Sequence, residues 1–349
     1  MSKFPLLLLI LVCHKVDAID WQGHRGARGL YPENSITAMK GALGFPISTL
    51  ELDVVISKDH KVIVSHEPWM NPEICKSEKL NLYQLKAEEI VKYDCGSKGH
   101  PAFPQQKRIF SGKPLLSSLL QEVKSAEVKF NVEIKSSEKA EKNGEQPDYK
   151  LFSELVVKVL KEHLAPTRFT IQSFDWRVLK YLHEKYPEIG LVALKEEAYS
   201  PEGVIKELGF HPAVFSPYYK NLQTSHIEWF HQKNIKVIPW TVNSVSEMRR
   251  LILMGVDGII TDYPNLIPEA TQKACPEKHN FFEGKCVKVP THGIPSKTNP
   301  GWDCKPGFIQ KRSKCIKISI PEHAYLLKDG KTWICKEGYE RYRATCKKK

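Results

Sequence analysis

Short apolar runs alternate with amphipathic stretches from residue 19 to about residue 268 of the chain. This alternation is typical of a parallel β/α architecture, in which buried strands follow helices. We predict eight strands, over Asp20–His24, Thr49–Val55, Lys129–Lys135, Arg168–Gln172, Ile189–Leu194, Ala213–Ser216, Lys236–Trp240 and Asp257–Thr261. Apolar residues at helical spacing predict seven helices between most of these strands, over Ser35–Leu43, Leu115–Ser125, Tyr149–His163, Trp176–Lys185, Pro201–Leu208, Ser225–Lys233 and Ser244–Met254.

Eight strands over roughly 250 residues match the size of a TIM (β/α)8 barrel. We therefore predict an α/β fold of this type for residues 19–270. The sites of such barrels form on the face where the carboxyl ends of the strands lie. Polar residues that end a predicted strand are therefore the first candidates for chemistry.

One apolar run does not fit as a barrel strand. Lys61–Ser65 follows the second strand after only four residues, Ser57–His60, whereas a parallel crossover needs about a dozen or more. The run must therefore fold back as a hairpin, which returns His66 to the carboxyl end of strand two. Residues 67–113 are rich in Pro, Gly and Lys and are predicted to form an inserted loop or subdomain, which a Cys75–Cys95 disulfide would hold together.

The first 18 residues have the pattern of an export signal. Lys3 supplies a positive start, and Phe4–Cys13 is an apolar run too short to span a bilayer. Val16 and Ala18 fit the small residues that precede a cleavage site. We expect a signal peptide over residues 1–18 and a secreted or extracytoplasmic protein.

The cysteines support this expectation. Cys13 apart, the chain has eight, and six of them lie in the last 75 residues as three pairs separated by ten residues: Cys275 and Cys286, Cys304 and Cys315, Cys335 and Cys346. A zinc site is disfavoured because no Cys-x-x-Cys pair occurs in the sequence. We predict a small disulfide-rich module over residues 271–349, with each pair closing one short unit, although six cysteines allow other pairings.

The positive charge of the chain is concentrated in this module. Residues 271–349 hold 18 Lys and Arg against 7 Asp and Glu, a net charge of +11 out of +12 for the whole chain. One interpretation is a tail that binds an anionic surface such as a membrane, a cell wall or a glycan. The other is a solvated appendage whose lysines only raise solubility. Nucleic acid is not an expected partner, because export separates the protein from it.

The first predicted strand ends in a pair suited to an anion. His24 and Arg25 lie between Gly23 and Gly26, which let the backbone come close to a ligand. Arginine binds phosphate oxygens as a planar fork, and histidine transfers protons near neutral pH. His66 is the second candidate proton carrier, with Glu67 beside it as a group that would orient it.

Carboxylates occupy the next two predicted strands. Glu51 and Asp53 are two residues apart and therefore share one face, as do Glu133 and Lys135. Adjacent barrel strands would bring Glu133 beside the other two acids. Three oxygen ligands suit a hard divalent ion, Ca²⁺ or Mg²⁺. The alternatives are a solvated strand face and a simple Glu133–Lys135 ion pair.

Further strand ends add Gln172, Trp240 and Asp262 to the same side of the barrel. Gln172 and Trp240 are candidates for binding substrate, with the indole packed against a polyol or headgroup. We expect Asp262 to anchor a loop rather than to react.

As a set, these motifs resemble the glycerophosphodiester phosphodiesterase family. The matching segments span about residues 20–268 in order: HRG at 24–26, PENS at 32–35, ELDV at 51–54, VSHE at 64–67, VEIK at 132–135, QSF at 172–174, WTVN at 240–243 and DGIITDYP at 257–264. The resemblance implies hydrolysis of glycerophosphodiesters to glycerol 3-phosphate and an alcohol. It departs at Glu67, where the family often has Asp, and it does not cover the Cys-rich tail.

The resemblance also implies roles for single residues. His24 and His66 would act as acid and base, and Arg25 would bind phosphate. Lys135 and Trp240 would lie in the substrate pocket. The metal would be held by Glu51, Asp53 and Glu133.

Three other functions stay open. A spider-toxin-like phospholipase D or a lysophospholipase D would act on intact lipids. A phosphatidylinositol-specific phospholipase C also uses two histidines on a barrel, but it can lack a metal, so the three acids argue against it. A secreted binding protein would use the barrel as a scaffold and the basic tail for adhesion.

Overall fold

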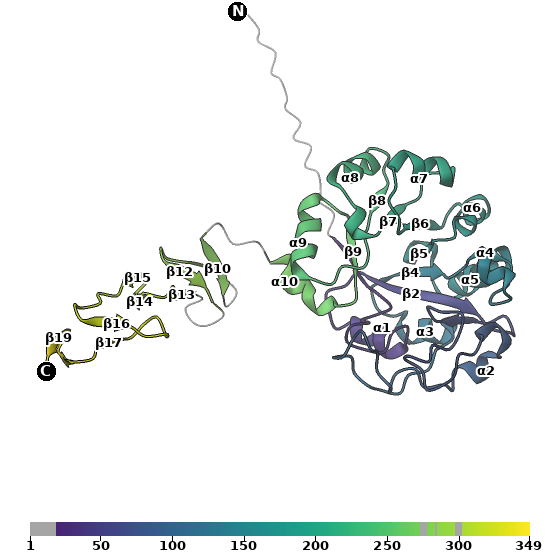
Figure 1. Ribbon diagram of the computed structural model, residues 1–349. Helices are drawn as coiled ribbons and strands as arrows, with labels where there is room; N and C mark the ends of the chain where they lie inside the picture. Colours follow the sequence, from purple (N-terminus) through teal and green to yellow (C-terminus); the bar gives the residue numbers. More distant parts are fainter. Residues whose placement is uncertain (1–18, 273–277, 283–284, 297–301) are drawn as a thin grey trace, which may run out of the picture. The chain divides into compact units, whose positions relative to one another are not determined.

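The computed structural model describes residues 19–272, 278–282, 285–296 and 302–349 (Figure 1). The predicted signal peptide over residues 1–18 lies outside the described residues. The chain divides into two compact units that meet between Thr271 and Gln272, and each unit is described here by itself. None of the helices in the described part of the chain is long and apolar enough to cross a bilayer.

Eight parallel strands form the sheet of the first unit, in the order β8-β7-β6-β5-β4-β2-β1-β9 (Figure 1). Their bounds are β1 (Asp20–Gly23), β2 (Thr49–Ile56), β4 (Lys129–Ile134), β5 (Phe169–Ser173), β6 (Gly190–Lys195), β7 (Val214–Pro217), β8 (Lys236–Val237) and β9 (Gly258–Thr261). Hydrogen bonds from Asp257 N to Val237 O and from Ile260 N to Pro239 O join the two ends of the sheet. The sheet is therefore nearly closed, and the predicted TIM barrel is confirmed.

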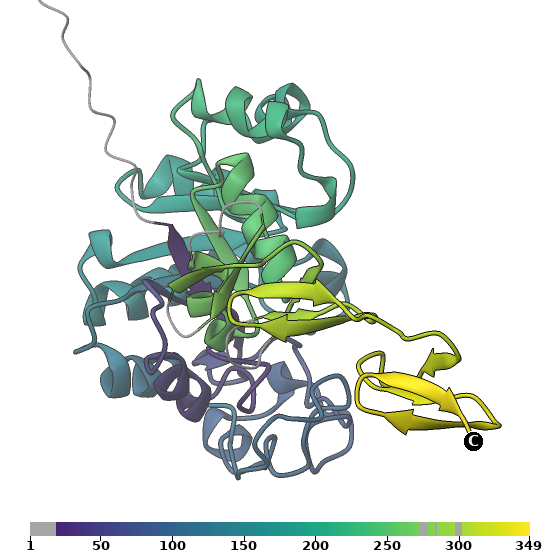
Figure 2. The same cartoon turned by 90° about the vertical axis from the view of Figure 1, so that its left-hand side faces the viewer.

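Helices surround this sheet on the outside in both views (Figures 1 and 2). The seven predicted helices are α1 (Ile36–Ala42), α3 (Leu116–Val123), α5 (Tyr149–His163), α6 (Trp176–Lys185), α7 (Pro201–Leu208), α8 (Thr224–His231) and α9 (Val245–Met254). Side-chain oxygens of Ser35, Asp148 and Ser200 cap helix N-termini by accepting backbone N–H bonds. Three short helices were not predicted, because four or five residues cannot show a helical period: α2 (Ala87–Ile90), α4 (Glu138–Lys142) and α10 (Ile267–Thr271).

One predicted strand is shorter than expected by more than one residue. We predicted Lys236–Trp240, whereas β8 ends at Val237. The backbone still pairs with β7 beyond that point, through Ile238 N to Phe215 O and Trp240 N to Pro217 O. Pro239 has no N–H group to donate, so the regular ladder stops before it.

The predicted hairpin is present. Strand β3 (Val62–Val64) runs antiparallel to β2, with Val54 opposite Val64. Ser65 N donates to Asp53 O at 3.0 Å, which brings the following residue, His66, back to the carboxyl end of β2. The short turn therefore determines where this histidine lies.

The insertion after this hairpin is structured. It contains a 3-10 turn, Leu82–Gln84, and helix α2, and the predicted Cys75–Cys95 disulfide is formed. Its own small core includes Met70, Ile74 and Leu82 and packs against the hairpin. The insertion is thus a subdomain rather than a structureless loop.

The second unit consists, in its described residues, of five antiparallel hairpins (Figure 2). The strands are β10 (His279–Phe282), β11 (Lys285–Lys288), β12 (Gly293–Pro295), β13 (Trp302–Cys304), β14 (Phe308–Lys311), β15 (Lys314–Lys317), β16 (Ala324–Leu326), β17 (Trp333–Cys335), β18 (Tyr339–Tyr342) and β19 (Thr345–Lys348). The predicted disulfides Cys304–Cys315 and Cys335–Cys346 are formed. The predicted Cys275–Cys286 pairing lies outside the described residues.

Candidate active site

The carboxyl ends of the barrel strands surround a pocket of about 210 Å³. Eight of the nine residues that the sequence singled out line it, and the ninth, Asp53, is buried beside them. The eight are His24, Arg25, Glu51, His66, Glu133, Lys135, Gln172 and Trp240. Arg28, Phe174 and Leu194 contribute to the same walls.

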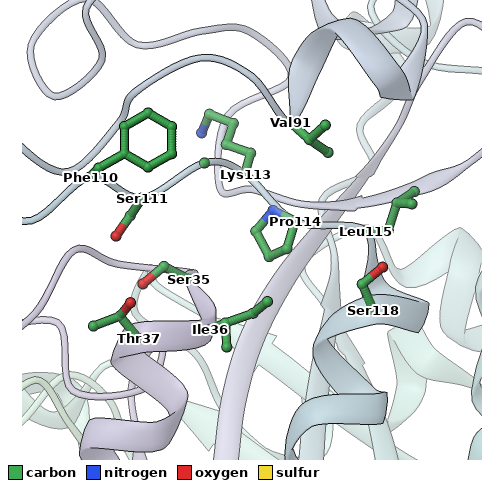
Figure 3. A pocket seen from close by; sticks show the side chains of 11 residues that line it. Ser35, Ile36, Thr37, Val91, Phe110, Ser111, Lys113, Pro114, Leu115 and Ser118 are labelled. Carbon is green, nitrogen blue, oxygen red and sulfur yellow. The ribbon is translucent and has the colours of Figure 1, made fainter.

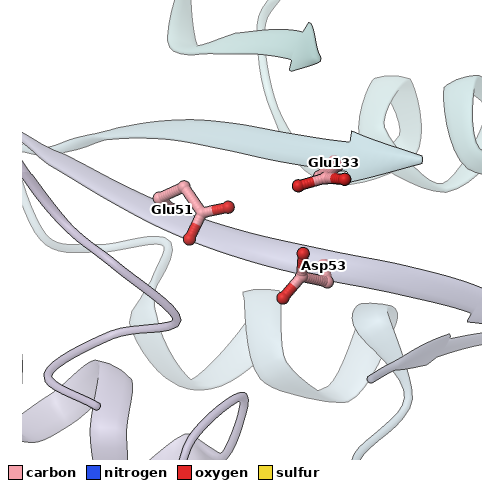
Figure 4. A group of neighbouring side chains, drawn as sticks. All are labelled: Glu51, Asp53 and Glu133. Carbon is pink, nitrogen blue, oxygen red and sulfur yellow. The ribbon is translucent and has the colours of Figure 1, made fainter. Parts of the chain in front are cut away.

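Three buried carboxylates lie close together at this pocket (Figure 4). Glu51 and Asp53 extend from β2, and Glu133 lies opposite Asp53 on β4. One ligand oxygen from each residue lies within 4.8 Å of the others. Burial and the nearby charges of Asp53 and Glu133 raise the pKa of Glu51. Like charges held this close need a compensating cation or a proton.

The donor set fits a hard divalent ion. All three side chains offer oxygen, which Ca²⁺ and Mg²⁺ prefer. Oδ2 of Asp53 accepts a hydrogen bond from Asn34 Nδ2 at 2.8 Å and lies 3.2 Å from Arg25 Nε. Its other oxygen, Oδ1, is buried and has no hydrogen-bond partner. A buried carboxylate oxygen that has no hydrogen-bond partner, within a cluster of acids, is available to bind a cation.

His24 is fixed by a carboxylate that the sequence analysis assigned only to a loop. Its Nδ1 lies 2.6 Å from Asp262 Oδ1, and Asn243 donates to the second oxygen of Asp262 at 2.6 Å. Burial lowers the pKa of His24 below its ordinary value, more than Asp262 raises it. The ring is therefore neutral at neutral pH, with Nδ1–H donated to Asp262 and the Nε2 lone pair available. Nε2 lies 4.0 Å from Glu51 Oε2.

His66 approaches the same pocket from the hairpin. Its Nδ1 lies 3.0 Å from Glu67 Oε1, and its side chain is 30% exposed. The preceding residue, Ser65, accepts a hydrogen bond at 2.7 Å from the buried ammonium group of Lys113, at the end of the insertion. Lys113 was not predicted, because its role depends on how the insertion returns to the barrel.

Arg25 lies between two acids. Its backbone N–H donates to Glu51 Oε2 at 2.8 Å, and its Nη1 donates to Glu33 Oε1 at 2.9 Å. Burial alone would raise the pKa of Glu33, but the guanidinium groups of Arg25 and Arg28 lower it far below its ordinary value. Glu33 therefore stays charged and holds both arginines. The sequence signal was its place in the PENS motif.

The loop that carries Arg25 requires glycine at its next position. Gly26 has φ of +87°, and a Cβ there would lie 2.6 Å from the carbonyl carbon of Ala38. Only glycine combines this backbone conformation with so close an approach to α1.

The remaining predicted residues complete the walls. Lys135 Nζ lies 2.6 Å from Glu133 Oε1, so the ion pair that the sequence offered as an alternative is formed within the acidic cluster. Gln172 donates to Glu51 Oε1 at 2.8 Å. The indole N–H of Trp240 donates to Ser216 O. The ring of Trp240 packs edge-to-face with that of Phe174, with 5.4 Å between the ring centroids.

The insertion also reaches the pocket wall. Arg28 Nη2 lies 3.2 Å from His100 Nε2, and the guanidinium group lies 4.7 Å from the centroid of the Phe103 ring. These two insertion residues had no sequence signal, because they lie more than 70 positions from Arg28.

A second cavity, of about 460 Å³, lies between the start of α1 and the end of the insertion (Figure 3). Phe110, Pro114 and Ile36 form its apolar walls. Its one ionisable lining residue is Lys113, whose ammonium group already bonds Ser65. This cavity contains none of the nine predicted site residues.

The chain matches the model of the glycerophosphoryl diester phosphodiesterase family over residues 24–266. A glycerophosphodiester phosphodiesterase of Caldanaerobacter subterraneus subsp. tengcongensis is 29% identical, over 72% of this chain and 96% of the relative. A lysophospholipase D of Homo sapiens is 25% identical, over 70% of this chain and 82% of the relative.

Solved structures show the same fold. A putative glycerophosphoryl diester phosphodiesterase from Silicibacter pomeroyi aligns with a TM-score of 0.66 at 23% identity, over 72% of this chain and 94% of the other. A phosphodiesterase from Oleispira antarctica, solved in complex with the product sn-glycerol-3-phosphate, gives 0.62 at 21% identity, over 72% and 96%. The barrel, the ordered motifs and the family match agree, and the chain belongs to the glycerophosphoryl diester phosphodiesterase family of phosphoric diester hydrolases.

Proposed function

We propose that this protein is a secreted, divalent-metal-dependent enzyme that hydrolyses glycerophosphodiesters to glycerol 3-phosphate and an alcohol. The observation that carries the proposal is the convergence of His24 and His66 on one pocket beside three buried carboxylates. The two histidines reach it from different elements, the end of β1 and the β2–β3 hairpin. A general base and a general acid beside a cation site are the groups that an in-line displacement at phosphorus needs.

Charge neutralisation is divided among several groups. Glu51, Asp53 and Glu133 would hold one Mg²⁺ or Ca²⁺ ion, which supplies positive charge to the phosphate oxygens when bound. Arg25 and Lys135 line the same pocket and add fixed positive charge for the phosphodiester and its transition state. The side-chain amide of Gln172 donates to Glu51 and thereby holds this carboxylate in position. Its main role is this contact and not a contact with phosphate.

The two proton transfers are divided between the two histidines. Neutral His24 accepts a proton at Nε2 from the attacking hydroxyl, either water or the glycerol 2-hydroxyl. The new oxygen–phosphorus bond forms as the bond to the alcohol breaks, and His66 acts as the general acid that gives a proton to the departing oxygen. With the 2-hydroxyl as nucleophile, water then opens the cyclic phosphate by the reverse transfers. Asp262 stabilises the imidazolium that His24 becomes.

A lysophospholipase D activity is the second candidate. Phe174 lines the pocket and is 41% exposed, and together with Trp240 it forms an apolar wall beside Lys135. An apolar rim suits a substrate that keeps an acyl chain, and the human relative above is named for that activity. Parallel assays on glycerophosphocholine and lysophosphatidylcholine separate the two functions.

The proposal that the protein is secreted rests on its disulfides, its first residues and the charge of its tail. The three disulfides of the described residues suit an oxidising compartment, and the pattern of residues 1–18 suits export. The net charge of +11 on residues 271–349 supports a tail that holds the enzyme on an anionic surface.

The histidines provide the test. His24→Ala and His66→Ala should each lower kcat/KM for glycerophosphocholine by about 10³-fold, because a positioned acid or base contributes roughly that much. The exposed His211, outside the pocket, supplies the matched control His211→Ala, which should retain wild-type turnover. Product analysis should find glycerol 3-phosphate. Wild-type turnover by either of the first two variants would refute the assignment.

A further inference from the structure

Two copies of one structural unit are found among the described residues of the tail. Residues of the second copy follow their counterparts in the first by 31 positions, as Cys304 and Cys335 show. In each copy a histidine ring stacks at 4.1 Å on an aromatic ring that follows a glycine: His292 on Phe308, and His323 on Tyr339. The carbonyl groups of these histidines accept equivalent bonds, from Lys305 N and Lys336 N.

The last hairpin of each copy ends in an equivalent turn. Arg312 occupies the turn between β14 and β15, with φ of 58°. Arg343 occupies the turn between β18 and β19, with φ of 54°. Both side chains are exposed. The fold thus presents a cation at the same place twice.

The first of these hairpins combines cations with exposed apolar side chains. Ile309 and Ile316 are cross-strand partners that are 43% and 44% exposed. Lys311 and Lys314, also cross-strand partners, lie two positions nearer the turn on the same face. With Arg312 between the two lysines, the tip holds three cations next to an apolar pair and has no acid.

The second hairpin also combines cations with an exposed side chain that can enter an interface, here a tyrosine. Tyr342 is 52% exposed beside its turn, and Lys347, on the same face, lies 4.2 Å from the centroid of its ring. Arg343 lies 5.8 Å from that centroid. Glu340 is the one acid on this face and is the cross-strand partner of Lys347. Proteins that contact a membrane often place tyrosine and neighbouring cationic side chains in the headgroup region of the bilayer.

We propose that the two hairpin tips bind the surface of an anionic phospholipid bilayer, with the side chains of Ile309, Ile316 and Tyr342 entering the interface. This inference deepens the proposed role of the tail and is independent of the reaction in the barrel. Lysine and arginine near an anionic bilayer are attracted to its surface, and apolar side chains gain by entering the headgroup region. A sulfated glycan would pair with the cations but would not favour the exposed isoleucines.

Sedimentation of the full chain with vesicles tests the proposal. Wild-type protein should bind vesicles of phosphatidylcholine with phosphatidylglycerol and should not bind phosphatidylcholine alone. Ile309→Ser with Ile316→Ser should weaken binding by about tenfold, because two apolar side chains leave the interface. Lys314→Glu should also weaken it by about tenfold, since a reversed charge changes the attraction by roughly two elementary charges.

A matched variant lies on the opposite face of the same strand. Lys317→Glu makes the same charge change as Lys314→Glu but points away from the apolar pair, and it should weaken binding by less than about threefold. Peptide mapping of the Cys304–Cys315 disulfide and unchanged turnover of glycerophosphocholine check that each variant is folded.

Four outcomes would overturn the proposal. Equal loss from Lys314→Glu and Lys317→Glu would mean that no particular face docks. Wild-type binding by the double serine variant would mean that the apolar pair does not enter the bilayer. Binding to heparin but not to any vesicle would keep an anionic surface as partner and remove the lipid, whereas binding to neither would also remove the proposed role of the tail.

Discussion

The barrel and the tail place their charged residues in opposite ways. In the barrel, Glu51 and Asp53 are about 1% exposed and lie within a strand, β2, whose eight residues are all buried. In the tail, Lys311, Arg312 and Lys314 project from the end of a two-stranded hairpin. Buried charges are costly and persist only where a surrounding fold holds them, so they are suited to catalysis. Exposed charges cost little and are suited to binding a surface.

The two units also differ in what stabilises them. Fully buried side chains such as Phe130, Phe152 and Phe215 belong to one continuous core in the barrel. The described core cluster of the tail is small, with Trp302, Cys304 and Cys315 as its buried members. A unit with so little apolar burial depends on its disulfides. The barrel can therefore lose a site residue and stay folded, whereas the tail cannot lose a disulfide without consequence.

The largest expected effect comes from removing one buried charge in the barrel. Glu133→Gln should lower kcat/KM by about 10³-fold, because the pocket loses a ligand of its cation site. The melting temperature should change little, since burial and the charge of Asp53 raise the pKa of Glu133, and this relief offsets the loss of the ion pair with Lys135. The exposed Glu162 on α5 supplies the control Glu162→Gln, which should change neither quantity. More than a tenth of wild-type activity in Glu133→Gln would contradict the assignment.

The second effect concerns the disulfides. Cys304→Ser with Cys315→Ser should destabilise its tail unit by about 2–3 kcal/mol, enough to open a unit with so small a core. Limited proteolysis should then cut within residues 302–318 while the barrel stays intact. The same change at Cys75 and Cys95 should leave the insertion protected, because Met70, Leu82 and Ile90 keep it packed against the hairpin. Equal protease sensitivity of the two regions would contradict the comparison.

The third effect concerns the partner of His24. Asp262→Asn should lower kcat by roughly 10²-fold, because an amide cannot stabilise the imidazolium. The pH profile of kcat should shift in a direction that follows from the pKa of His24. Burial already lowers the pKa of His24 below its ordinary 6.5, so the acid limb of the wild-type profile lies below that pH. Loss of the Asp262 charge removes an influence that raises this pKa, so the acid limb should move to still lower pH. A limb that moves upward would contradict the pairing.

Much of the barrel could be predicted because its strands carry their own signal. Leu50–Ile56 is a continuous apolar run broken only by Glu51 and Asp53, and the four residues Ser57–His60 force a hairpin that returns His66 to the site. These are local facts about spacing. The acids share a face for the same reason, since alternation along a strand is fixed by geometry.

The contacts that could not be predicted join distant residues. His24 and Asp262 are 238 positions apart and meet only because β9 pairs with β1 when the barrel closes. His100 reaches Arg28 because of how the insertion folds back, which composition does not determine. The tail cysteines were predicted from equal spacing, but the repeated His–aromatic stacks depend on the hairpins around them.

The central claim is that three carboxylates and two histidines form one metal-dependent phosphodiesterase site. Its most direct test is the turnover of glycerophosphocholine by protein stripped with EDTA and then titrated with Mg²⁺ or Ca²⁺. We expect the stripped protein to lose activity, regain it with one equivalent of ion per chain, and fail to regain it in the Glu133→Gln variant at the same concentration. Full turnover by the stripped wild-type protein would contradict the claim.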